Sequence, residues 1–211
     1  MTTTKKYTFG FNAASLRLNE MINIEKYAVK HDLDKYDKIE DKSSLIGRGK
    51  SRTSEREFHE LKKRLEKLSI KQKSLLLNGD LSAQKQIAFL GVCKHYRFIR
   101  DFVVEVIREK FSVFDYQLSE GDYLTFFRRQ QESNPELERL AETTFKKAKQ
   151  VLWKILEQSD IIDDVNNKNI QPQLLNQDTT RAIIDDNPEW LKIYMLSDAE
   201  IHELKETYGK N

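Results

Sequence analysis

The residues best suited to chemistry are cations gathered before and along one predicted helix, in the stretch GRGKSRTSEREFHELKKRLEKL from Gly47 to Leu68. Between Ile46 and Lys73 the sequence has ten basic and four acidic residues, a local excess of six positive charges, although the whole chain carries only +2. No acidic residue occurs between Asp41 and Glu55 to neutralise the cluster. Such a cluster favours the binding of anions, and of nucleic-acid phosphates in particular.

The element that must position these cations is a helix predicted to begin near Ser54, because Ser54 and Glu57 fit a capping box. Its apolar face is predicted by steps of three and four residues, at Phe58, Leu61, Leu65 and Leu68. The start of a helix also has free N–H groups and a positive dipole end, which attract anions. The predicted DNA contacts of this part are Arg48, Lys50, Ser51, Arg52, Ser54, Arg56, Lys63 and Lys67.

An ordinary solvated helix is the alternative interpretation of this stretch. Glu60 can pair with Arg56 and Arg64, four residues before and after it, and such pairs give a charged solvent face a modest stability. The cluster RGKSR favours anion binding over this alternative, since it has no local carboxylate.

A second candidate surface lies on a long helix predicted from about Pro135 to Gln158. The pattern assigns Phe145, Ala148, Leu152, Ile155 and Leu156 to its buried face, with Trp153 at the edge of the core. The remaining predicted DNA contacts lie on the other faces, and they are Thr143, Lys146, Lys147, Gln150 and Lys154. A solvated helix face is again the alternative.

A β-hairpin is predicted directly after this second helix. Two apolar pieces, Ile161–Ile162 and Ile170–Leu175, flank the polar cluster DDVNNKN, which contains typical turn-forming residues. A basic helix followed by a hairpin is the layout of a winged helix, a common DNA-binding element.

The composition predicts a mainly α-helical protein of two small subdomains. The 211 residues include 33% charged and 38% hydrophobic residues but only 7 Gly and 3 Pro, too few for a loop-rich or all-β chain. Three short helices, the third basic at its front, give residues 1–78 the order of a helix-turn-helix domain. The helix stop at Asn78-Gly79 separates this part from residues 79–211, a helical domain with the winged-helix-like element.

The sequence offers little support for catalysis or cofactor binding. Its four histidines are scattered, and the lone Cys93 lies in an apolar run that predicts a buried, reduced thiol. The acidic pairs Asp163-Asp164 and Asp185-Asp186 could serve a metal-dependent nuclease, but turn formation is a sufficient reason for both. Neither a signal peptide nor a membrane-spanning run is apparent, so we expect a cytoplasmic, non-enzymatic protein without a cofactor or metal.

Several segments, taken in order, resemble the BrxA family of BREX bacteriophage-defence systems. They are FNAASLRLNEM, KSRTSEREFHELKKRLEKL, YRFIRDFVVEVIREKF, LSEGDYLTFF, NPELERLAETTFKKAKQVLWKILEQSDIIDD and IQPQLL, which together cover most of the chain. The resemblance implies a small helical DNA-binding protein without catalytic motifs. The family is encoded beside a DNA methyltransferase, a large ATPase and a phosphatase-like protein of the same system, so the resemblance makes these proteins candidate partners.

Double-stranded DNA is therefore the predicted partner, bound mainly through phosphates by the two basic surfaces. Two alternatives remain open. An adaptor between the larger proteins of the system would use Trp190, Tyr194 and Met195 as partner contacts. An older comparison of the family with an RNA-binding antitermination factor makes RNA the other alternative.

Overall fold

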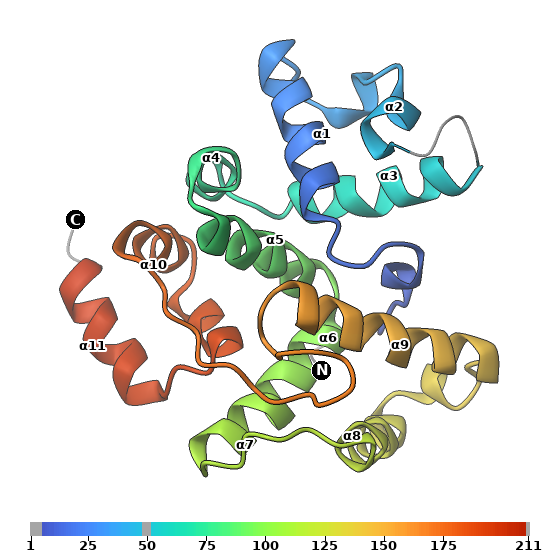
Figure 1. The fold of residues 1–211 in the computed structure, drawn as a ribbon, viewed down its shortest axis with the longest axis vertical. Coiled ribbons are helices and arrows are strands. Elements are labelled where there is room, and N and C mark those ends of the chain that lie inside the picture. The colour runs from blue at the N-terminus through green and yellow to red at the C-terminus, as the bar shows by residue number, and fades with distance from the viewer. Residues whose placement is uncertain (1–5, 48–51, 210–211) are drawn as a thin grey trace.

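The computed structural model describes residues 6–47 and 52–209, and every regular element within them is helical (Figure 1). The first part of the chain forms η1 (Gly10–Ala13), α1 (Leu18–Lys30), η2 (Tyr36–Lys38), α2 (Lys42–Ile46), α3 (Arg52–Leu65) and α4 (Ile70–Asn78). The middle forms α5 (Leu81–His95), α6 (Arg97–Phe102), η3 (Val103–Ile107), α7 (Arg108–Ser112) and α8 (Glu120–Ser133). The rest forms η4 (Pro135–Leu137), α9 (Glu142–Gln158), α10 (Gln177–Ile184), η5 (Pro188–Tyr194) and α11 (Asp198–Tyr208).

The first three helices follow the predicted order, with shifted boundaries. Helix α1 begins at Leu18 because Arg17 adopts a left-handed backbone conformation, with φ of 55°. Helix α3 already includes Arg52, so Ser54 lies inside the helix, where its side chain is fully buried. The predicted capping box of Ser54 and Glu57 is therefore wrong. The apolar face of α3 is confirmed, since its predicted side chains are all buried: Phe58, Leu61, Leu65 and, just beyond the helix end, Leu68.

The predicted helix break at Asn78-Gly79 is confirmed, because α4 ends there and Asp80 caps α5. Helix α3 packs closely on α5. A Cβ atom added to Gly91 would lie 3.3 Å from the backbone oxygen of Arg64, so this crossing requires a very small residue. The division into residues 1–78 and 79–211 stays a prediction.

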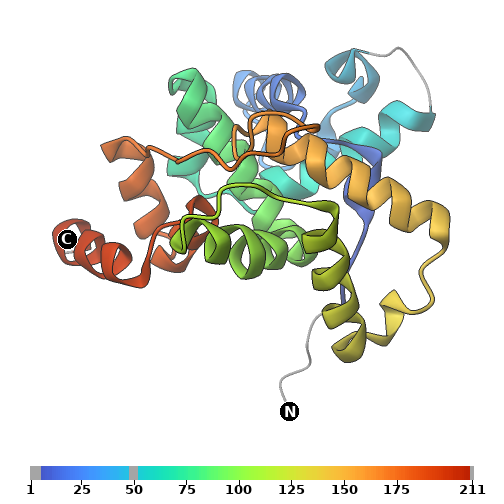
Figure 2. The same cartoon turned by 60° about the horizontal axis from the view of Figure 1, so that its bottom comes forward.

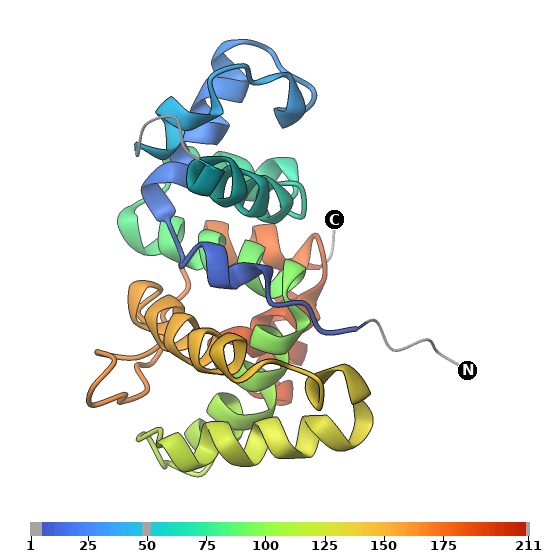
Figure 3. The same ribbon diagram turned by 90° about the vertical axis from the view of Figure 1, so that its right-hand side faces the viewer.

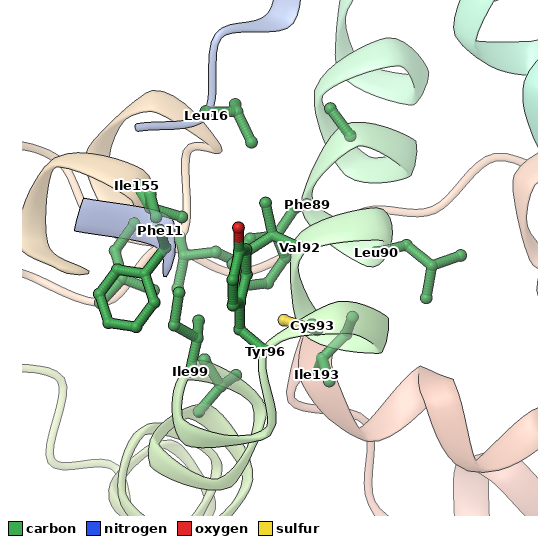
Figure 4. Close-up of a cluster of buried hydrophobic side chains, with 14 of the residues drawn as sticks. Phe11, Leu16, Phe89, Leu90, Val92, Cys93, Tyr96, Ile99, Ile155 and Ile193 are labelled. Carbon is green, nitrogen blue, oxygen red and sulfur yellow. The ribbon is translucent and has the colours of Figure 1, made fainter. Parts of the chain in front are cut away.

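Helices α5 and α6 supply the centre of the core. Phe89, Val92 and Cys93 of α5 are fully buried, as are Tyr96 and Ile99 just after it (Figure 4). The Phe11 ring of η1 lies edge-on to Tyr96, at 5.3 Å between centroids, and thereby anchors the N-terminal segment to this core. Cys93 is a buried free thiol, as predicted, and burial raises its pKa well above the ordinary value.

One predicted helix boundary in the second half is wrong. Helix α8 begins at a capping box formed by Ser119 and Asp122. The long helix predicted from Pro135 is instead two elements, η4 and α9, because Ala141 adopts an extended conformation with ψ of 141°. The predicted buried face of α9 is confirmed at Ala148, Leu152, Ile155 and Leu156, while Phe145 is partly buried.

The predicted β-hairpin after α9 does not form a ladder, and the described residues contain no β-strand. The chain does double back through a single antiparallel bridge between Ile162 and Ile170, and Asn169 forms a second bridge to Gln117, before α8. Two backbone N–H groups that would extend the pairing have other acceptors. Asn169 donates to the Asp163 carboxylate at 2.8 Å, and Ile161 donates to the Leu156 carbonyl at 2.9 Å.

The last helices lie at the opposite side of the molecule from α8 (Figure 2). Tyr194 and Met195, named as partner contacts for the adaptor alternative, are 2% and 5% exposed and belong to the core, so they cannot serve as those contacts. Trp190 packs against this core and is partly buried. Among residues 6–47 and 52–209, no helix is both long and apolar enough to cross a lipid bilayer.

Candidate nucleic-acid interface

The two predicted basic helices line one groove. The N-terminal segment with η1 runs between α3 and α9 (Figures 1 and 3). This segment lines a groove of about 710 Å³. Its lining includes Thr53 and Arg56 of α3 and Lys147, Gln150 and Lys154 of α9. Two surfaces that are far apart in the sequence therefore face the same space.

The floor of the groove is held by hydrogen bonds from both helices. The buried Arg64 guanidinium of α3 donates to the carbonyl oxygens of Ala14 at 2.6 Å and Leu16 at 3.3 Å. The Leu16 N–H donates to Gln158 Oε1 of α9 at 3.0 Å. The small side chains of the floor, Ala13 and Ala14, leave the space open, and these bonds fix its position.

The wall formed by α3 contains one cation without an ion-pair partner. Arg56 is exposed and pairs with no carboxylate in the described part of the chain. Beside it, Glu57 forms an ion pair with Arg17 at 2.8 Å, and Arg17 also pairs with Glu20 at 3.0 Å. Arg17 thus neutralises the one carboxylate of the lining.

The wall formed by α9 presents an exposed polar row. Lys147 donates to Gln150 Oε1 at 3.3 Å, and Lys154 pairs with Glu157 on the next turn. All three groove-lining residues are exposed, because the opposite side of α9 is the buried one. Counting both walls and the floor, the lining has four cations and one carboxylate, an excess of three positive charges.

The other predicted contact residues have different places. Arg48, Lys50 and Ser51 lie outside the described residues. Ser54 is buried and cannot reach a ligand on the surface, so it is excluded from the interface. The remaining residues are on the surface but do not line the groove, and they are Arg52, Lys63, Lys67, Thr143 and Lys146.

Part of the positive cluster seen in the sequence has structural partners. Lys62 pairs with Asp37 at 2.5 Å, and Lys63 pairs with Glu60 at 2.8 Å. Burial opposes ionisation of Glu60, yet hydrogen bonds from Lys63 and Tyr96 outweigh it and lower the pKa of Glu60. The cations that remain available on this side are fewer than the sequence count indicates. They include Arg52, Arg56 and Lys67, which have no ion-pair partner among the residues described.

Several lining residues were not singled out from the sequence as contacts. Asn12, Arg17 and Gln158 belong to the floor and its supports, and Trp153 and Val165 complete the lining. The only signal for the floor was the run of small residues in FNAAS. These lining residues come together through tertiary packing, which the helical periodicity of the sequence does not predict.

The acidic pairs have structural roles. Asp164 accepts hydrogen bonds from the backbone N–H groups of Asn166 at 2.7 Å and Asn167 at 2.9 Å, which closes a turn. Lys71 pairs with Asp185 at 2.6 Å, and Lys94 pairs with Asp186 at 2.7 Å. Within the described ranges, no three metal-ligating side chains lie close enough together to hold a metal ion.

Known proteins resemble the chain in sequence and in fold. The BREX protein BrxA of Bacillus cereus (strain H3081.97) is 30% identical over 107 residues, which are 50% of this chain and 54% of that protein. The aligned part thus spans about half the length of that curated relative. The crystal structure of an uncharacterized protein from Magnetospirillum magneticum shares the fold, with a TM-score of 0.74 at 16% identity over 90% of this chain and 98% of that one.

A family model gives the wider match. The model of the BrxA family matches residues 5–187, which include both helices of the groove and all of the segments between them. The chain therefore belongs to the BrxA family.

Proposed function

We propose that this chain is a non-enzymatic DNA-binding component of a BREX-type phage-defence system. The observation that supports the proposal is the common groove of α3 and α9, whose lining has an excess of three positive charges. The family and the name of its Bacillus cereus relative support the place in a BREX system.

Phosphate contacts account best for the residue types that line the groove. Arg56, Lys147 and Lys154 can neutralise phosphates, and Thr53 and Gln150 can donate hydrogen bonds to them. Few side chains are suited to reading base edges in a duplex, so binding depends mainly on charge and only weakly on sequence. The helix-turn-helix order of α1 to α3 and a winged-helix role for α9 and its following loop are further parts of this proposal.

A salt titration tests the proposal. Binding of a fluorescent DNA duplex is measured by anisotropy at several salt concentrations for the natural chain and for the double variant Arg56→Ala/Lys147→Ala. Each lost phosphate contact reduces the slope of log K against log salt by about 0.9, so the double variant should lose about 1.8 units of slope.

A matched control separates the groove from general surface charge. The double variant Arg52→Ala/Lys146→Ala removes the same charge from the same two helices but outside the groove. It should keep nearly the natural affinity and slope. Equal losses in both double variants would move the interface away from the groove, and absence of duplex binding at low salt would refute the proposal. The same titration with duplex RNA tests the alternative of an RNA ligand.

One observation favours an adaptor role as the second candidate function. Phe114 and Val113, in the turn after α7, are 80% and 69% exposed, and Tyr116 beside them is 43% exposed. Exposed aromatic side chains of this kind are typical of protein-contact sites. Co-purification with the ATPase or methyltransferase that is lost on Phe114→Asp, without any binding to DNA, would favour this function over the first.

A further inference from the structure

We propose that the groove between α3 and α9 is a binding site for one nucleotide whose base is not paired. The inference rests on the proposed function, because it concerns the same groove, and it names the form of nucleic acid that the groove fits. The phosphate would lie at the cationic rim and the base on the floor.

The shape of the groove suits a nucleotide better than a phosphate alone. Its volume of about 710 Å³ lies within the range of roughly 300–1,000 Å³ that is typical of small-molecule sites. Contact with the outside of a duplex needs no such depth, because phosphates project from the duplex surface. The floor and the inner wall carry small or apolar side chains, Ala13, Ala14, Val151 and Val165, on which the face of a base can lie.

Three residues of the lining have a buried polar atom without a hydrogen-bond partner within the described residues. These atoms are Trp153 Nε1, on a side chain only 4% exposed, Arg17 Nε and Asn12 Oδ1. Buried donors and acceptors in proteins are almost always paired, so two unpaired donors and one unpaired acceptor on residues of the same lining point to a ligand. The edge of a nucleobase carries both kinds of group, whereas a phosphate carries only acceptors.

The cations are placed for the charged part of the same ligand. Arg56 approaches from α3, and Lys147 and Lys154 approach from α9, so that the phosphate of one nucleotide can be bound from two sides. Single-strand binding sites combine a basic rim with a surface for bases in this way. The chemistry is shared by a nucleotide of an unpaired strand and by a free nucleotide.

The test compares three DNA probes with the full chain. They are a fully paired duplex, the same duplex with one unpaired thymidine, and free thymidine monophosphate as competitor. We expect the duplex with the unpaired thymidine to bind about tenfold more tightly than the paired one, which corresponds to about 1.4 kcal/mol. If free thymidine monophosphate displaces the unpaired probe at a similar concentration, the ligand is a free nucleotide. If it does not, the ligand is an unpaired nucleotide within a strand.

Variants in the floor separate this inference from the proposed function. Ala13→Leu fills the floor without changing charge, and Trp153→Phe removes one of the unpaired donors but keeps an aromatic ring. Each should remove the preference for the unpaired thymidine, measured as the ratio of the affinities of the two duplexes for the same variant. Ala199→Leu, on the exposed face of α11, is the matched control and should change neither affinity.

A second measurement uses the protein's own fluorescence. The chain has 2 Trp, so a Trp190→Phe variant leaves Trp153 as the single reporter. Its emission should change on addition of the unpaired probe and not on addition of the paired duplex. Binding of the paired duplex with no preference for the unpaired thymidine would overturn this inference and leave the proposed function standing. If no probe binds, both are wrong.

Discussion

The buried guanidinium of Arg64 donates a hydrogen bond to the backbone oxygen of Ala14 at 2.6 Å, and this contact joins helix α3 to the floor of the groove. Arg64 is fully buried, and its guanidinium lies 5.3 Å from the centre of the Tyr96 ring. A residue that counts toward the positive cluster in the sequence is thus part of the scaffold and does not reach the surface.

Replacement of Arg64 by Met should destabilise the fold strongly. The carbonyl oxygens of Ala14 and Leu16 would lose their donor while buried, so we expect the free energy of unfolding to fall by about 3 kcal/mol. Urea denaturation measures this change. Lys67→Met removes an exposed cation one turn away and should change stability by less than about 0.5 kcal/mol. Similar stability of the two variants would contradict the scaffold role of Arg64.

The local features of the fold could be predicted from the sequence because they depend on neighbouring residues. The apolar steps of α3 and α9 assign their buried faces correctly. The stop at Asn78-Gly79 follows from backbone chemistry, since the Cβ of any other residue at position 79 would lie 2.6 Å from the Leu75 carbonyl oxygen.

Features that depend on distant contacts could not be predicted in this way. Arg56 and Lys147 line the same groove only because of tertiary packing. The hairpin stays a single bridge because the Asp163 side chain and the Leu156 carbonyl accept the hydrogen bonds of two N–H groups that a longer ladder needs, those of Asn169 and Ile161. The charge count overestimates the number of unpaired cations, since a cation such as Lys62 has a carboxylate partner, Asp37, from another segment.

Release of Lys154 from its ion pair should strengthen DNA binding. Lys154 lines the groove but pairs with Glu157, whose carboxylate lowers the local positive potential. Glu157→Gln should therefore raise duplex affinity several-fold at low salt, and the gain should shrink as salt screens the charges. Anisotropy titrations at two salt concentrations measure both effects.

The control for Glu157→Gln is Glu138→Gln, which makes the same charge change at an exposed position outside the groove. It should leave the affinity nearly unchanged. An equal gain in the two variants would mean that only the net charge of the protein matters.

The stability of the protein should depend on pH through His95. Burial is the main cause that lowers the pKa of His95 from 6.5 to about 4. The negative charge of Glu60 opposes this shift, and the nearby cations Lys63, Arg64 and Lys67 add to it. Between these values the unfolded chain binds a proton that the folded chain does not. The stabilising contribution is therefore complete above about pH 6.5 and is lost as pH falls toward about 4.

Urea denaturation at pH 7 and pH 5 tests this dependence in the natural chain and in His95→Gln. The natural chain should lose more stability between the two pH values than the variant does. Glu60 stabilises the folded chain because its pKa there is lowered from 4.5, the ordinary value of a glutamate. This stabilisation is lost only below about pH 4.5, so it does not contribute to the difference between pH 7 and pH 5. Equal losses in the two proteins would assign the pH dependence to other groups.

Replacement of Phe114 by glycine should stabilise the isolated protein. Its backbone has a φ of 63°, in the left-handed region, and its ring is 80% exposed. The left-handed conformation destabilises the folded state by about 1–2 kcal/mol for a residue with a side chain, and glycine removes this cost. Glycine also gives the unfolded chain more conformational freedom, which lowers stability by about 0.4–1 kcal/mol. Phe114→Gly should therefore raise the free energy of unfolding by about 0.5 kcal/mol.

The neighbouring residue gives the control, because Val113 has a φ of −104° and gains nothing from glycine. Val113→Gly should lower stability by about 0.5–1 kcal/mol. If the turn is a partner-binding site, Phe114→Gly will weaken co-purification with the larger defence proteins while it stabilises the chain, a combination that damage to the fold cannot produce. A less stable Phe114→Gly variant would show that the ring contributes to folding and would remove the physical reason for assigning it to a partner.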